Sequence, residues 1–116
     1  MASLSTHVLD TSLGTPVPGL RVGLSRWSSD TDSGTGEIGL GERTTDDDGR
    51  IAAFGPDDLD PGSYVLRFDT GAYFARSGVR GFYPQVVVVF TVADGAEHHH
   101  VPVLLSPFGY STYRGS

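Results

Sequence analysis

Short segments with alternating apolar and polar or small residues recur along the chain. Residues 20–25 read Leu-Arg-Val-Gly-Leu-Ser, and residues 64–69 read Tyr-Val-Leu-Arg-Phe-Asp. A period of two is that of a strand with one buried face. Further strands are expected from their β-branched and aromatic content over 3–11, 39–45, 50–54, 85–93 and 97–105. About seven strands separated by turn residues predict an all-β, two-sheet sandwich.

The turns between these segments contain many of the 16 glycines and 7 prolines. Asp48-Gly49 and Asp94-Gly95 predict hairpins, because Gly readily adopts the positive φ of such turns. Residues 69–78 differ: they read Asp-Thr-Gly-Ala-Tyr-Phe-Ala-Arg-Ser-Gly, with capping candidates at the start and Gly at the end. This segment is predicted to be the only helix, and a short one.

Residues 28–41 are rich in Ser, Thr, Asp and Gly and contain only two large apolar side chains. They predict a mobile loop between two strands. The three aspartates at 46–48 do not have the spacing of a calcium loop, so we interpret them as a solvated turn.

The apolar run Val86-Val87-Val88-Val89-Phe90 does not alternate in residue type. A sandwich strand with one solvated face should alternate, so something must cover the second face of this one. In so small a chain we expect that cover to be another subunit, which predicts an oligomer.

Length and composition exclude several classes of protein. The 116 residues indicate one domain, 1–116, and the absence of cysteine excludes disulfides and cysteine-ligated metal centres. The net charge of −6 argues against nucleic-acid partners, which need a basic surface. No apolar run approaches the roughly 20 residues of a membrane-spanning helix. With no visible signal peptide, a cytoplasmic protein is expected.

Three consecutive histidines begin the last predicted strand. Alternation places His98 and His100 on one face and His99 on the other. Two imidazoles at this spacing can begin a metal site, with His7 as a third ligand. A histidine that titrates near neutrality can instead serve as a general base. Solvated polar strand residues are the third interpretation, and the residues alone leave all three open.

Arg50 and the last residues are further candidates for chemistry. The guanidinium of Arg50 could hold a planar carbonyl or urea-like group through two parallel hydrogen bonds, or it could be an ordinary surface charge. Residues 106–116 contain three aromatic side chains, whereas chain ends are usually polar and frayed. This tail is therefore expected to pack against the rest of the protein.

Several segments carry a family resemblance that extends nearly from end to end. The chain resembles the 5-hydroxyisourate hydrolases, transthyretin-related enzymes of urate breakdown, in Ser-Thr-His-Val-Leu-Asp at 5–10, Asp-Gly-Arg at 48–50, Phe-Asp-Thr-Gly-Ala-Tyr-Phe at 68–74, Phe-Tyr-Pro at 82–84, His-Val-Pro at 100–102 and Tyr-Arg-Gly-Ser at 113–116. The last motif is the most specific, because the hormone carrier transthyretin lacks it. The chain departs from the family at His99, where Tyr is usual, and in a longer acidic loop from Ser28.

The resemblance implies a transthyretin-like sandwich of seven to eight strands with one short helix, assembled as a homotetramer with sites at subunit contacts. It implies hydrolytic opening of the ring of 5-hydroxyisourate at an amide bond, with no cofactor and no metal. The implied catalytic residues are His7, Arg50, His100 and Ser116, and the implied substrate-binding residues are His7, Arg50, Tyr113, Arg114 and Gly115.

In this scheme His100, helped by His7, activates water, and Arg50 holds a carbonyl oxygen as negative charge develops. The hydroxyl or carboxylate of Ser116 could orient the water. Which histidine takes the proton is left open.

Other classes remain as alternatives. A non-catalytic small-ligand carrier on the same fold would need mostly apolar walls, so converging His7, Arg50 and His100 would argue against it. A purely structural sandwich module predicts nothing special at these residues. A metal-dependent hydrolase would lose activity on chelation.

Overall fold

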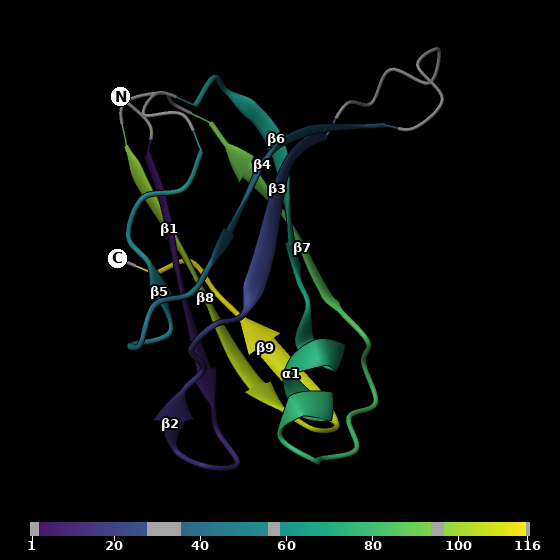
Figure 1. The fold of residues 1–116 in the computed structure, drawn as a ribbon. Coiled ribbons are helices and arrows are strands. Elements are labelled where there is room, and N and C mark those ends of the chain that lie inside the picture. Colours follow the sequence, from purple (N-terminus) through teal and green to yellow (C-terminus); the bar gives the residue numbers. More distant parts are fainter. Residues whose placement is uncertain (1–2, 28–35, 56–58, 94–96, 116) are drawn as a thin grey trace.

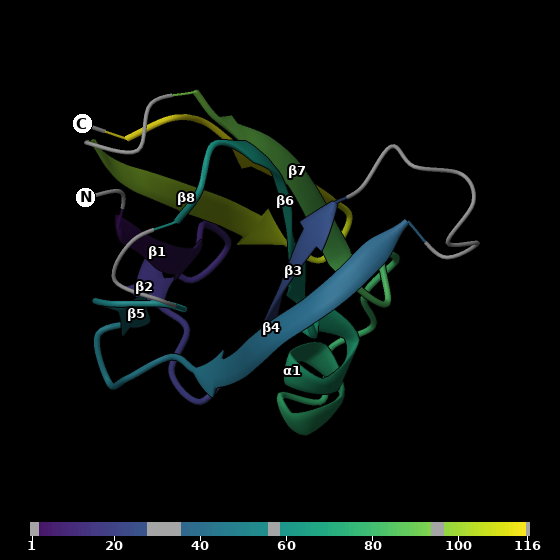
Figure 2. The same cartoon turned by 90° about the horizontal axis from the view of Figure 1, so that it is seen from above.

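The computed structural model describes residues 3–27, 36–55, 59–93 and 97–115, which form two packed β-sheets and one short helix (Figures 1 and 2). The strands are β1 (Ser3–Asp10), β2 (Thr15–Pro16), β3 (Arg21–Trp27), β4 (Glu37–Thr44), β5 (Arg50–Ile51), β6 (Gly62–Phe68), β7 (Val86–Val92), β8 (His98–Ser106) and β9 (Gly109–Thr112), and the helix is α1 (Thr70–Arg76).

One sheet has the order β2-β1-β8-β9, with β5 also paired to β1, and the other has the order β4-β3-β6-β7. The pair β1–β8 is parallel, and the other pairs among these strands are antiparallel. The inner faces of both sheets share one hydrophobic cluster, which includes Leu4, Val22, Leu66, Phe68 and Val103. The expected two-sheet β-sandwich with one short helix is therefore confirmed.

Strands β2 and β9 were not predicted, so the described residues contain nine strands rather than seven to eight. Strand β2 has only two residues, and β9 reads Gly-Tyr-Ser-Thr without an apolar alternation. Strand β5 ends at Ile51 rather than at residue 54. Strands β2 and β5 are both held by main-chain pairing to β1, and residue type is a poor predictor of such pairing.

Both hairpin predictions are wrong. Strands β7 and β8, which flank Asp94-Gly95, belong to different sheets, and so do β4 and β5 around Asp48-Gly49. Residues 94–96 themselves lie outside the described part of the chain. Gly49 does adopt a positive φ of 75°, so this turn has the expected backbone but connects two sheets instead of two neighbouring strands.

The predicted loop over 28–41 is wrong for its last five residues, which form the start of β4. Residues 28–35 lie outside the described residues. Strand β4 is an edge strand with mostly exposed positions, and its main chain pairs with β3 across an irregularity at Leu24/Ser25. An exposed edge strand needs no apolar alternation, which is why its composition indicated a loop.

The predicted helix is confirmed over Thr70–Arg76. It ends as expected, with Gly78 at a φ of 67°, but the side chain of Asp69 makes no capping hydrogen bond. The hydroxyl of Thr70 instead donates to the carbonyl of Tyr83, 3.1 Å away. Among the described residues, no helix has the length and apolar character required to cross a membrane.

Strand β7 lies at the edge of its sheet. Its burial alternates although its residue types do not: Val86 and Val88 are buried, whereas Val89 is 56% exposed. Within the described chain nothing buries this second face, and its coverage by another subunit stays a prediction.

Candidate active site

The candidate residues are gathered by the parallel pairing of β1 with β8. Along β1, Leu4, Thr6 and Val8 point into the core, so Ser5 and His7 lie on the outer face of the sheet. The register places Ser5 beside His100. Two segments from opposite ends of the sequence thus contribute side chains to one surface.

A tight turn places Arg50 beside His7. Strand β5 pairs with β1 so that Arg50 lies opposite His7. The Asp46 carboxylate accepts hydrogen bonds from the backbone N–H groups of Asp48 and Arg50, both at 2.9 Å. A side chain at Gly49 would place its Cβ 2.5 Å from the carbonyl oxygen of Val8, so only Gly allows this close approach.

The same turn also orients the His7 ring. Nε2 of His7 donates a hydrogen bond to the carbonyl oxygen of Asp48 at 2.9 Å. Because that carbonyl can only accept, Nε2 carries the proton and Nδ1 of the neutral ring is an acceptor.

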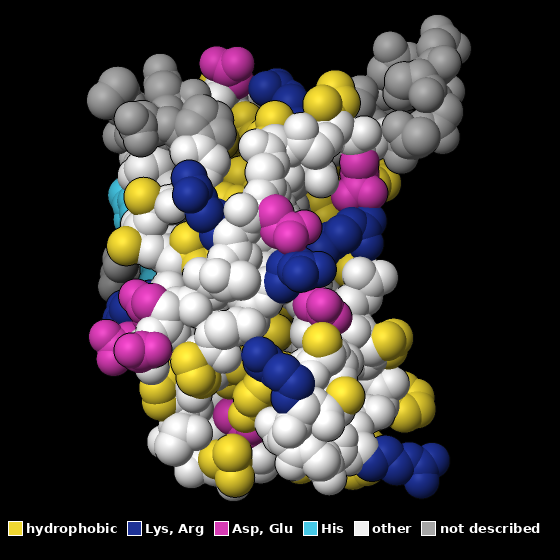
Figure 3. All heavy atoms as spheres, viewed as in Figure 1, with side chains coloured by type: hydrophobic (Ala, Val, Ile, Leu, Met, Phe, Trp, Pro, Cys, Tyr) yellow, Lys and Arg dark blue, Asp and Glu magenta, His cyan; other side chains and the backbone are white. Residues whose placement is uncertain are grey.

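Hydroxyl groups connect the outward-facing histidines. Oγ of Ser5 lies 2.7 Å from Nδ1 of His100 and 2.8 Å from Nε2 of His98. These groups surround a shallow depression of about 310 Å³, lined by Ser5, Thr6, Arg50, Ile51, Ala52, His98 and His100. Histidine surface is visible at the left margin of Figure 3, on the side of β1 and β5, with acidic side chains grouped below it.

The surroundings of His100 favour its neutral form. Burial lowers the pKa of His100 below its ordinary value, and His7, Arg50 and His98 lower it further whenever they carry charge. A hydrogen bond with the backbone of Ser5 acts in the opposite direction but does not outweigh them. A neutral imidazole near neutral pH is what a general base requires.

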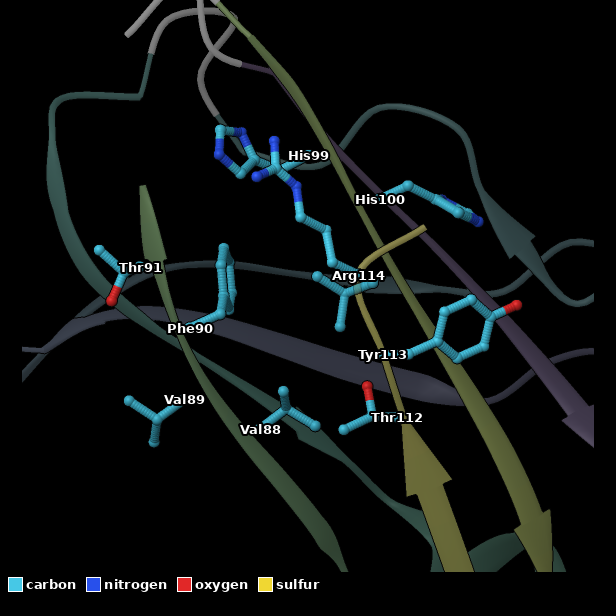
Figure 4. Close-up of a pocket in the computed structure, with 10 residues that line it drawn as sticks. Val88, Val89, Phe90, Thr91, His99, His100, Thr112, Tyr113 and Arg114 are labelled. Carbon is cyan, nitrogen blue, oxygen red and sulfur yellow. The ribbon is translucent and has the colours of Figure 1, made fainter. Parts of the chain in front are cut away.

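The tail adds Gly115 and Tyr113 to the same side of the sheet. The N–H of Gly115 donates to the carbonyl of His100 at 2.8 Å. A Cβ at Gly115 would lie 2.5 Å from Cδ2 of His100, so the tail main chain packs directly on the imidazole. Figure 4 shows His100 and Tyr113 pointing to one side. Ser116, expected to act on the water, lies outside the described residues.

Arg114 is separated from this set. It alternates with Tyr113 and Gly115 and therefore points to the opposite side, where its guanidinium pairs with Glu97 at 2.7 Å. There it borders a second, more apolar cleft of about 290 Å³, whose lining includes His99 and also His100 and Tyr113 (Figure 4). The guanidinium of Arg114 thus points away from His7 and Arg50, and its role in substrate binding stays a prediction.

The three interpretations of the histidines can now be compared. His98 and His100 share one face and His99 the other, as alternation predicts. In the parts of the chain that the structure describes, no three His, Asp or Glu side chains group as metal ligands. The histidines are instead bridged by Ser5, a contact that sequence reasoning missed. Only part of the signal was available: Ser5 precedes His7 by two residues and so shares its face, but the pairing of β1 with β8 is not visible in the sequence.

The fold and this outer face define a β-sandwich protein that presents imidazole, hydroxyl and guanidinium groups together on one sheet. The HIUase/Transthyretin family model matches residues 4–115, so the chain belongs to this family.

Its relatives include 5-hydroxyisourate hydrolases and a transthyretin. The 5-hydroxyisourate hydrolase of Mus musculus is 44% identical over 114 residues, covering 97% of this chain and 94% of the relative. The solved 5-hydroxyisourate hydrolase of Klebsiella pneumoniae is 40% identical with a TM-score of 0.84, covering 100% of this chain and 94% of the other. Sea bream transthyretin, solved in complex with thyroxine, is 30% identical with a TM-score of 0.86, covering 97% and 93%.

Proposed function

We propose that this chain hydrolyses 5-hydroxyisourate in urate degradation. The single observation that carries the proposal is the gathering of His7, Arg50 and His100 on one outer sheet face, with the pKa of His100 lowered by burial and by the neighbouring positive charges. The hydrolase relatives at 40–44% identity support the same activity.

In the proposed mechanism His100 acts as the general base. Ser5 engages Nδ1 of His100, whereas Nε2 has no hydrogen-bond partner among the described residues. Nε2 takes a proton from water as the oxygen attacks the carbonyl carbon of a ring amide. The C–N bond then breaks, the nitrogen leaves with a proton, and the ring opens to a carboxylate.

Arg50 and His7 handle the charge that this attack creates. The carbonyl oxygen becomes negative in the transition state, and the planar guanidinium of Arg50 can stabilise it with two donors. His7, held by the carbonyl of Asp48, keeps its ring fixed beside Arg50. Tyr113 and Gly115 close one wall next to His100, and Ser116 orients the water. Arg114 completes substrate binding only if assembly or closure brings it across the sheet.

A carrier function is the competing proposal, since transthyretin shares this fold. A carrier of an apolar ligand needs mostly apolar walls. The depression beside His100 includes the apolar Ile51 and Ala52, but a serine, a threonine, two histidines and an arginine also line it, and this polar set favours turnover over simple binding.

We further propose that the protein works as a homotetramer. The exposed apolar residues of edge strand β7 support this, because one edge of β7 has no partner strand in the described chain and Val87 and Val89 are exposed, which favours contact with another subunit. The sites would then lie near subunit contacts, as in the resemblance described above.

The test compares two neighbouring histidines. His100→Ala removes the base and should lower kcat by at least about 10²-fold. His99→Ala, on the opposite face, should retain most activity if the protein stays folded. Substrate decay is followed by ultraviolet absorbance, and circular dichroism checks folding. Equal losses in two folded variants would remove His100 from the site.

A further inference from the structure

We propose that His98 is a positioning residue for this reaction, acting through Ser5 to set which nitrogen of His100 carries the proton. The inference rests on the proposed function, because it concerns the state of the base.

The contacts form a continuous series of hydrogen bonds between hydroxyl and imidazole groups. Oγ of Ser3 lies 2.5 Å from Nδ1 of His98, Nε2 of His98 lies 2.8 Å from Oγ of Ser5, and Oγ of Ser5 lies 2.7 Å from Nδ1 of His100. The register of β1 and β8 creates this order, since Ser3 lies opposite His98 and Ser5 opposite His100. The alternation of both strands keeps all four side chains on one face.

These hydrogen bonds link the protonation of the His98 and His100 rings, because the hydroxyl of Ser5 has only one hydrogen to donate. If His100 is to accept a proton at Nε2, its neutral ring must carry its own proton on Nδ1. That Nδ1–H then donates to Oγ of Ser5. The hydroxyl of Ser5 must direct its hydrogen elsewhere, and Nε2 of His98 lies at 2.8 Å to accept it.

In the reverse arrangement Ser5 donates to Nδ1 of His100, and the proton of the ring lies on Nε2. His100 then cannot accept a proton from water at that nitrogen. With its own proton on Nδ1, toward Oγ of Ser3, a neutral His98 presents Nε2 as this acceptor and favours the reactive tautomer of His100.

The electrostatic setting is compatible with this role. The charged and titratable groups acting on His100 come from three strands: His7 on β1, Arg50 on β5 and His98 on β8. Burial lowers the pKa of His100 most, and His7, Arg50 and His98 lower it further whenever they carry charge. The lowered pKa favours the neutral ring, whose tautomer decides whether Nε2 can accept a proton.

Three variants, with two controls, test this hydrogen-bond series. Ser5→Ala and His98→Ala remove the bridge and the acceptor, whereas His98→Gln supplies an amide oxygen that can accept from Ser5. Ser111→Ala, on the outer face of β9, and His99→Gln, on the opposite face of β8, are matched controls. The readouts are kcat, KM and the pH profile for 5-hydroxyisourate, and the ¹⁵N chemical shifts of His100 in the free protein.

We expect wild-type His100 to carry its proton on Nδ1 and to move it to Nε2 in Ser5→Ala and His98→Ala. In these two variants kcat should fall at least about tenfold with KM unchanged, because only the state of the base has altered. His98→Gln should retain both the tautomer and most of kcat.

An unchanged tautomer and kcat in Ser5→Ala and His98→Ala would overturn the proposal, as would equal losses in His98→Gln and His98→Ala. The spectra need no substrate, so a failure of the proposed function is distinguishable: the wild type would then not accelerate substrate decay, whatever tautomer His100 shows.

Discussion

Three features of this turn determine the position of Arg50. Gly49 permits the close approach to β1, Asp46 accepts the N–H of Arg50, and strand pairing aligns Arg50 with His7. Main-chain contacts therefore set the position of the Arg50 side chain. Its chemistry depends on the planar guanidinium rather than on positive charge alone.

Arg50→Lys should consequently fold normally and lose most activity. Lysine keeps the charge but not the two parallel donors, and loss of an oxyanion contact costs on the order of 10²-fold in kcat. Steady-state kinetics and a thermal melt measure the two effects. Arg43→Lys, on the edge strand of the other sheet, is the control and should leave kcat unchanged. Near-normal turnover in Arg50→Lys would exclude Arg50 from the chemistry.

Gly115→Ala is predicted to impair catalysis without unfolding the protein. The new Cβ would lie 2.5 Å from Cδ2 of His100, so either the ring or the tail must move. A displaced base should lower kcat by roughly 10²-fold, since small misplacements of reacting groups are costly. Gly109→Ala is a matched control, because its Cβ would meet only Oγ of Ser106 at an ordinary 3.7 Å. Full activity in a folded Gly115→Ala protein would contradict the role given to the tail.

At the residue scale, the sequence supports the choice of His7, Arg50 and His100 mainly through the family resemblance. Alternation alone correctly separates His99 from His98 and His100. It cannot show that Arg114 pairs with Glu97, or that Ser5 bridges two imidazoles, because these contacts depend on which strands become neighbours.

Helix α1 is tied to the end of β1 by a buried polar contact. The hydroxyl of Tyr73 donates to Oδ2 of Asp10 at 2.7 Å, and Oδ1 of Asp10 accepts from the N–H groups of Ser12 and Leu13. Burial alone would raise the pKa of Asp10, but hydrogen bonds from Ser12 and Tyr73 outweigh it and lower the pKa below 3.8. The same burial and carboxylate contact raise the pKa of Tyr73 to about 12.

Tyr73→Phe should therefore reduce the free energy of unfolding by about 1.5–3 kcal/mol at neutral pH, the usual range for a hydrogen bond to a charged group. The folded-state pKa of Asp10 lies below the unfolded value, so its stabilisation is present above about pH 3.8 and is lost as the pH falls through the folded pKa. Urea unfolding at several pH values measures this. The difference from wild type should shrink in acid, and a constant difference at all pH values would contradict the assignment. Tyr110→Phe, whose ring is 42% exposed, is the control.

At the element scale, alternation located β3 and β6, each of which has a buried face, and β-branched and aromatic content located β1, β7 and β8. The edge strand β4 and the short β2, β5 and β9 were missed or misjudged, since main-chain pairing holds them without a matching apolar pattern. The hairpin predictions failed for a related reason: a Gly turn shows that the chain reverses, not which sheet the next strand joins.

At the scale of the whole molecule, the pairing of β1 with β8 creates the site, and no local sequence pattern predicts this pairing. Strands β1 and β8 are adjacent and parallel although Ser5 and His100 are 95 residues apart in sequence. The sandwich class follows from local periodicity, whereas the site exists only once these distant segments meet.

The same scale includes assembly. Val89, on edge strand β7, is 56% exposed, and Val89→Glu should disfavour any subunit contact there. Sedimentation of the wild type should give a tetramer, and the variant should shift to smaller species with its β-sheet circular dichroism retained. Thr91→Glu, an exposed position on the same strand, tests whether the effect follows the apolar side chain. A monomeric wild type would contradict the proposed assembly.

The central claim is that the outer face around His100 turns over 5-hydroxyisourate using the chain's own side chains. The most direct measurement is the ultraviolet decay of freshly generated 5-hydroxyisourate with and without chelator-treated protein. The account predicts decay that accelerates in proportion to protein concentration and persists after chelation, because histidine and arginine alone serve the water attack. Decay equal to the uncatalysed rate, or acceleration restored only by added metal, would contradict it.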